Sequence, residues 1–134
     1  MCYRISGDLE ANAGLVDNAC QYYDQALKIV RDCSDHIGII EVQLSRGRFA
    51  ARHIKNADEA FIDLGEALNY AMLGGYRIYE ADIRVALVWA QLAAGNKEKA
   101  EAEAIYAKKM SKEMGYYWGK KDAEEVLAKL EEIN

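Results

Sequence analysis

The feature that most constrains this chain is a pattern of small and large apolar residues that occurs three times. The first copy has Ala19, Tyr23 and Ala26, which stand at positions i, i+4 and i+7 and so lie on one face of a helix. The second copy is Ala60, Leu64 and Ala67, and it begins 41 residues after the first. The third copy is Ala100, Ala104 and Ala107, and it begins 40 residues after the second. A fixed period of this length indicates an array of repeated units, each stacked on its neighbour.

Each copy follows a second periodic segment that ends at a turn signal. The turn signals are Gly14, the Lys55-Asn56 pair and Gly95-Asn96. Glycine and asparagine adopt the left-handed conformation that ends helices, and asparagine also caps the helix that follows. The unit is therefore predicted to be helix, short turn, helix, with one extra residue in the turn of the second unit.

The predicted fold is all-α, an α-α superhelix in a single domain over residues 1–134. It has about three helical hairpins, at about 2–33, 36–73 and 76–114, and a capping helix at about 117–133. The chain has no proline, which suits continuous helices because proline breaks helix interiors. Alanine at the crossing positions lets two helix backbones approach closely.

Composition narrows the classes of partner. The net charge of −5 has the wrong sign for neutralising phosphates, so we expect no direct binding to nucleic acid. The longest apolar stretch, Val85 to Ala90, is far shorter than the roughly 20 residues that cross a bilayer. Arg4 and Asp8 stand where a signal peptide needs an apolar run. We therefore expect a cytoplasmic protein that does not bind membranes.

Signatures of catalysis and of metal sites are missing from the sequence. There is no glycine-rich phosphate loop, no metalloprotease motif and no nucleophile motif. We therefore expect no enzymatic activity, no cofactor and no metal. A capping or solvent-exposed role for His36 and His53 is favoured over metal binding, which needs further ligands. Cys20 and Cys33, predicted on one helix, are expected to be buried and inert thiols.

At these residues the sequence resembles the tetratricopeptide repeat family. The first unit matches the family pattern with Gly7, Gly14, Ala19, Tyr23 and Ala26, and the third with Leu87, Gly95, Ala100 and Ala107. The period is longer than the usual value of about 34, and the helix-ending proline is missing. In this respect the chain is similar to kinesin light chain and to sensor regions of bacterial signal-transducing ATPases and maltose-activator-like regulators.

The resemblance implies a scaffold that binds a protein or peptide, as a sensor or adaptor segment of a larger regulatory protein. In this family the first helix of each unit lines a concave groove. By repeat position that groove comprises Arg4, Asp8, Glu41, Leu44, Arg48, Arg52, Asp82, Val85 and Trp89, and Asp122, Glu125 and Lys129 continue it on the last helix. These residues do not match the carboxylate clamp of the chaperone-binding members, so chaperone-tail binding is not expected.

Arg48, Arg52 and Trp89 are the main candidates for contacting a partner. The two arginines are one helical turn apart and are suited to holding a carboxylate or phosphate together. The alternative is a solvated face with salt bridges to neighbouring acidic residues. Trp89 is a candidate anchor for an apolar side chain of the partner, and packing between units is the alternative.

Two other functions remain open at this point. The chain begins at its first helix without a capping residue, so we expect it to be an excerpt of a longer protein. An open end of this kind also suits a structural array that associates with another copy of itself. The third possibility is a sensor that closes on a small ligand or peptide.

Overall fold

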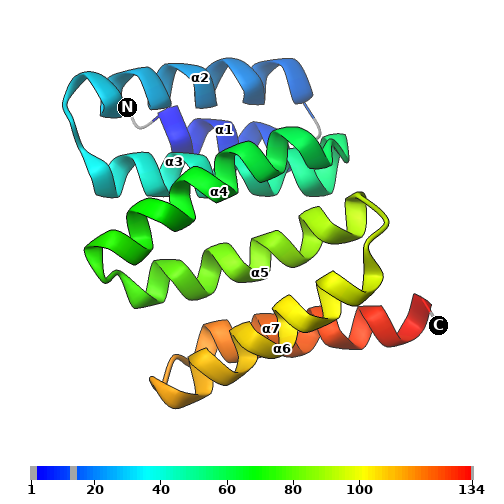
Figure 1. Ribbon diagram of the computed structural model, residues 1–134. Coiled ribbons are helices and arrows are strands. Elements are labelled where there is room, and N and C mark those ends of the chain that lie inside the picture. The colour runs from blue at the N-terminus through cyan, green and yellow to red at the C-terminus, as the bar shows by residue number, and fades with distance from the viewer. Residues whose placement is uncertain (1–2, 13–14, 134) are drawn as a thin grey trace.

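The computed structural model describes residues 3–12 and 15–133 (Figure 1). This part of the chain forms seven α-helices and one π-helical turn and has no strand. The helices are α1 (Tyr3–Asn12), α2 (Val16–Asp32), α3 (His36–Phe49), α4 (Ala57–Gly74), α5 (Arg77–Ala93), α6 (Lys97–Glu113) and α7 (Tyr117–Ile133), and the π-helical turn η1 is Ala50–Ile54. The all-α prediction is confirmed. Cys2 and the expected turn residue Gly14 lie outside the described residues.

Helices α1, α2 and α3 lie at one end of the molecule, α6 and α7 at the other, and α4 and α5 between them (Figure 1). Each helix packs against the next. The odd-numbered helices also contact one another, α1 with α3, α3 with α5 and α5 with α7. These four helices therefore form a continuous row, and they contribute most of the candidate site.

Three of the turns depend on a glycine in the left-handed region. Gly75, Gly95 and Gly115 have φ of 70°, 80° and 71° and end α4, α5 and α6. The residue after each glycine donates its N–H to a carbonyl five residues earlier, at 2.8, 2.9 and 2.8 Å. These bonds satisfy carbonyls at the helix end that have no partner inside the helix. The connections from one helix to the next are consequently short.

The extra residue of the second unit lies at the end of its first helix, in η1. In the second unit, residues 36–56 precede the second helix, and in the third unit residues 77–96 do, so the second unit is longer by one residue. A π-helical turn holds one more residue per turn than an α-helix and often occurs at functional sites. It ends at Lys55, whose φ is 58°. The prediction placed the extra residue in the turn; the structure places it in the helix.

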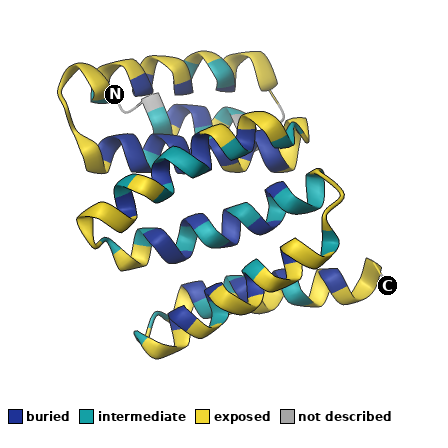
Figure 2. Ribbon diagram, viewed as in Figure 1, coloured by how far each residue is buried: buried dark blue, intermediate teal, exposed yellow. Residues whose placement is uncertain are grey.

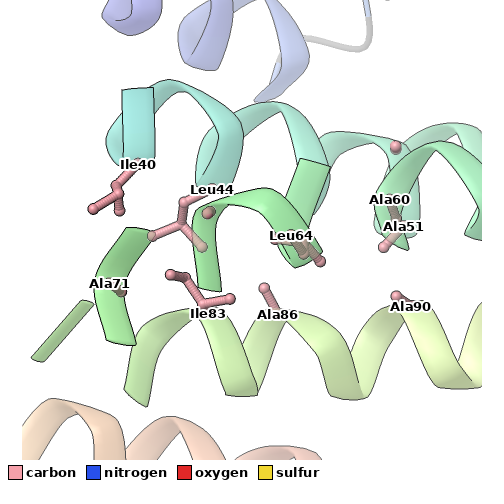
Figure 3. Close-up of a cluster of buried hydrophobic side chains, with 11 residues drawn as sticks. Ile40, Leu44, Ala51, Ala60, Leu64, Ala71, Ile83, Ala86 and Ala90 are labelled. Atoms are coloured by element: carbon pink, nitrogen blue, oxygen red, sulfur yellow. The ribbon is translucent and has the colours of Figure 1, made fainter. Parts of the chain in front are cut away.

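The repeated pattern forms the centre of the core. All nine pattern residues, on α2, α4 and α6, are at most 6% exposed. The largest buried cluster joins α3, η1, α4 and α5, with small alanines where the helices cross (Figure 3). Its buried members are Ile40, Leu44, Ala50, Ala51, Ala60, Leu64, Ala67, Ala71, Ile83, Ala86 and Ala90. Burial of this apolar surface stabilises the stack of helices.

Gly47 of α3 lies directly against the side chain of Leu64 of α4. A Cβ atom added to Gly47 would lie 2.6 Å from Cγ and Cδ2 of Leu64. Leu64 is fully buried, so it has little room to move away. Gly47 thus lets the large residue of the second pattern copy fill the space beside α3.

Buried residues lie on the helix faces that point toward neighbouring helices, and exposed residues lie on the outer faces (Figure 2). Cys20 is half-buried and Cys33 is exposed. The prediction that both thiols are buried is therefore wrong for Cys33, because this residue stands at the C-terminal end of α2, beyond the packed part of the helix. None of the described helices has the length and apolar character needed to cross a membrane.

Candidate functional site

Two adjacent pockets open on the row of odd-numbered helices, and they share Arg48 and Arg52. We call the first the arginine pocket; its volume is about 280 Å³, and it is lined by Arg4, Asp8, Tyr23, Ser45, Arg48, Phe49, Arg52 and His53. We call the second the tryptophan pocket; its volume is about 290 Å³, and it is lined by Arg48, Arg52, Val85, Ala86, Trp89, Asp122, Glu125 and Lys129. Six of the nine predicted groove residues line one or both pockets: Arg4, Asp8, Arg48, Arg52, Val85 and Trp89.

Asp8 is held by a set of donors on one side of the arginine pocket. Arg4 Nη1 donates to Asp8 Oδ2 at 3.2 Å, and Ser45 Oγ donates to the same oxygen at 3.4 Å. The hydroxyl of Tyr23 donates to Asp8 Oδ1. Burial, together with this bond, raises the pKa of Tyr23 well above its usual value, so the hydroxyl keeps its proton. The carboxylate of Asp8 is therefore neutralised by Arg4 and fixed in place.

Arg48 and Arg52 differ from the paired arginines of this chain. Arg46 forms two bonds with the carboxylate of Asp63, at 2.7 and 2.8 Å, and Arg84 is bonded to Glu80 at 2.9 Å. Arg48 and Arg52 are exposed, and in the described part of the chain neither has a carboxylate within salt-bridge distance or a hydrogen-bond partner. Two guanidinium groups are thus free to bind an external anion.

Trp89 lines the tryptophan pocket and contacts Arg52, which lines both pockets. The guanidinium carbon of Arg52 lies 4.4 Å from the centre of the Trp89 ring, which is a cation–π contact. The partly buried ring also packs against two clusters of core residues. Trp89 therefore packs against its neighbours in the core and also lines the tryptophan pocket; its role as an anchor for a partner remains a prediction.

Asp82 is engaged in a structural hydrogen bond and lines neither pocket. Tyr116, in the turn before α7, donates its hydroxyl to Asp82 Oδ1 at 2.8 Å. Burial is the main cause that raises the pKa of Asp82, and the nearby charge of Arg48 acts in the opposite direction. Asp82 thus ties α5 to the start of α7 and helps to place α7 beside the tryptophan pocket.

Leu44 was expected in the groove, and the structure corrects this expectation. Its side chain is 6% exposed and belongs to the cluster with Ile83 of α5 (Figure 3). The packing of α5 against α3 covers this level of α3 and removes the apolar side chain from water. Glu41 lies one turn earlier, is half-buried, and has Oε2 3.9 Å from Arg4 Nη2. It extends the charged surface beside the arginine pocket without lining it.

Several lining residues were not predicted for the groove, namely Tyr23, Ser45, Phe49, His53 and Ala86. Ser45 had a signal in the sequence, since positions 45, 48 and 52 have the spacing of one helix face. Phe49, the last residue of α3, stands one turn after Ser45 and had the same signal, whereas the position of His53 depends on η1. The ring of His53 is stacked on Phe49 with centroids 5.5 Å apart.

The region covered by the structure contains no group of three His, Cys, Asp or Glu side chains placed to hold a metal ion. Comparisons of the chain with models of known protein families, with curated proteins and with solved structures found no match. The site thus consists of two adjacent pockets with two unpaired arginines, the aromatic wall of Trp89, and Asp8 held by its hydrogen-bond partners. Two unpaired guanidinium groups of this kind can bind an anionic group of a ligand.

Proposed function

We propose that this chain is an interaction module of the tetratricopeptide type, a solenoid of helical hairpins that binds an extended segment of a partner protein along its odd-numbered helices. In a larger regulatory protein such a module would serve as a sensor or adaptor. The observation that carries this proposal is the unpaired state of Arg48 and Arg52 between two neighbouring pockets. Arginine and tryptophan are the residues that dominate binding hot spots.

The size and order of the pockets favour a peptide over a small buried metabolite. The pockets, of about 280 and 290 Å³, are at the lower limit of the usual range for drug-sized ligands, roughly 300 Å³, and each could hold one or two side chains of a peptide. The two pockets have a common wall formed by Arg48 and Arg52. Successive side chains of an extended peptide would occupy them in turn, which spreads the contact over α1, α3, α5 and α7.

The test is a selection of peptides from a displayed random library on the wild-type chain, followed by mapping of one selected peptide by NMR. We expect the peptide to shift backbone resonances of α3, η1 and α5 around Arg48 and Trp89. Arg48→Gln should weaken binding. Arg77→Gln is the matched control, because Arg77 is exposed on α5 and lines neither pocket. Selected peptides that shift only residues outside the two pockets would refute the proposal.

A further inference from the structure

The arginine pocket has an excess of positive charge in an acidic protein. The chain as a whole has a net charge of −5. In the pocket, Asp8 is paired with Arg4, so the two charges offset each other. Arg48 and Arg52 remain without a counter-charge among the described lining residues. The lining of the pocket therefore has two more positive than negative side chains. Asp82 and Asp122 lie outside this lining and near enough to interact electrostatically with Arg48, but neither forms a salt bridge with it.

The geometry points to a doubly charged anion as the group that this pocket holds. A carboxylate offsets one guanidinium, whereas a phosphoryl group carries a charge of about −1.5 to −2 near neutral pH and has three acceptor oxygens. Guanidinium groups bind phosphate by paired N–H donors. His53 adds an exposed imidazole to the lining, whereas the hydroxyl of Ser45 is already donated to Asp8. Asp8 does not compete for the arginines, because its oxygens already accept from Arg4, Tyr23 and Ser45.

The tryptophan pocket determines which kind of side chain the ligand can have beside the anionic group. It has an apolar wall formed by Val85, Ala86 and the Trp89 ring. Asp122, Glu125 and Lys129 line it from one face of α7 and have charges of both signs, so this side of the pocket does not favour an anion. A neighbouring side chain in this pocket would therefore be apolar.

We propose that the arginine pocket binds the phosphoryl group of a phosphorylated serine or threonine in the partner, with an apolar side chain of the same peptide in the tryptophan pocket. This inference rests on the proposed function and adds its regulation: phosphorylation of the partner would switch binding on. Arg48 and Arg52 are the residues that discriminate the phosphorylated from the unmodified partner.

The experiment uses three versions of one oriented peptide library, with phosphoserine, glutamate or serine at the fixed position. Affinities are measured by fluorescence anisotropy at constant ionic strength. We expect the phosphoserine peptides to bind at least about tenfold more tightly than the other two, since charge-assisted bonds to a dianion are stronger than those to a single carboxylate. Arg48→Gln and Arg52→Gln should each remove most of this preference, and Arg77→Gln should keep it. Circular dichroism confirms that every variant is helical.

A parallel NMR titration with inorganic phosphate, referenced to chloride at the same ionic strength, separates the possible sources of the anion. Shifts centred on residues 45–53 that disappear in Arg48→Gln, together with the phosphoserine preference, support the inference. Equal binding of the three libraries at the two pockets would overturn the inference and leave the proposed function standing. Binding of inorganic phosphate without any peptide binding would overturn both. Phosphate shifts that are no larger than those of chloride would also overturn the inference.

Discussion

The guanidinium carbon of Arg52 lies 4.4 Å from the centre of the Trp89 ring and joins the end of the second unit's first helix to the third unit's first helix. Arg52 belongs to η1, so the extra residue of the second unit determines where this guanidinium stands. The Trp89 ring contacts only the flat face of the guanidinium group. The N–H groups point outward in the plane of that group and so remain available to a ligand. One pair of residues thus serves both the stacking of units and the candidate site.

We predict a measurable coupling between Arg52 and Trp89 in stability. A double-mutant cycle with Arg52→Gln and Trp89→Leu should give a coupling free energy of about 0.5–1 kcal/mol, the usual range for a cation–π contact at an exposed site. Leucine is chosen because it retains part of the packing of Trp89. Urea unfolding of the four chains measures the free energies. Additive effects of the two substitutions would show that the contact does not contribute to the free energy of unfolding.

A pair of glycine substitutions tests the close approach of α3 and α4. Gly47→Ala should destabilise the chain by about 1–3 kcal/mol, because the new methyl group would overlap the fully buried Leu64. Gly65→Ala is the matched control: no heavy atom lies within 4 Å of its added Cβ, and alanine is favoured over glycine inside a helix by about 0.5–1 kcal/mol. The two substitutions should therefore have opposite signs in urea or thermal unfolding. A Gly47→Ala variant as stable as the wild type would refute this packing.

Much of the fold could be predicted from the repeated alanine pattern. Two helix backbones can approach closely only where the side chains between them are small, so alanines at this spacing indicate where helices cross. Ala60 and Ala100 are completely buried, and Gly95 and Gly115 stand at helix ends with positive φ. The π-helical turn could not be predicted, because a one-residue insertion has no distinct composition. Its position depends on how α3 packs against α4 and α5.

The candidate site was predictable in part. Repeat position gives the helix and the turn of the helix, which was enough to bring Arg48, Arg52 and Trp89 together. Repeat position does not show which residues of α3 a neighbouring helix covers. Leu44 was therefore predicted to line the groove, although α5 buries it. Likewise, repeat position could not reveal that Tyr116 binds Asp82, since that bond depends on the turn before α7.

Loss of the Tyr116 hydroxyl should loosen the connection between α5 and α7. Tyr116→Phe removes the 2.8 Å bond to Asp82 and leaves a half-buried carboxylate without this donor, which we expect to cost about 1–2 kcal/mol. Tyr117→Phe is the control, because Tyr117 is the next residue and is 63% exposed; its effect should stay within about 0.5 kcal/mol. Urea unfolding at neutral pH measures both. Equal effects of the two substitutions would contradict the proposed role of this bond.

The stability of the chain should depend on pH through Asp82. Burial, with a smaller contribution from Asp122, raises the pKa of Asp82 above its ordinary value of 3.8. The folded chain therefore binds this proton more tightly than the unfolded chain does. The favourable contribution of Asp82 to stability is complete below the unfolded pKa and is lost as the pH rises through the folded pKa. At neutral pH the ionised carboxylate consequently has a desolvation cost in the folded state.

Asp82→Asn removes that cost and retains an oxygen that accepts the Tyr116 hydrogen bond. We expect this variant to be more stable than the wild type at pH 7, with a difference that shrinks as the pH falls toward 4, where the wild-type carboxyl takes up its proton. Urea unfolding at intervals between these two pH values measures the difference. Asp32→Asn, at an exposed position of α2, controls for the loss of one negative charge from the chain. If both variants differ from the wild type in stability by the same amount at every pH, only the net charge matters. Burial of Asp82 would then have no effect on stability.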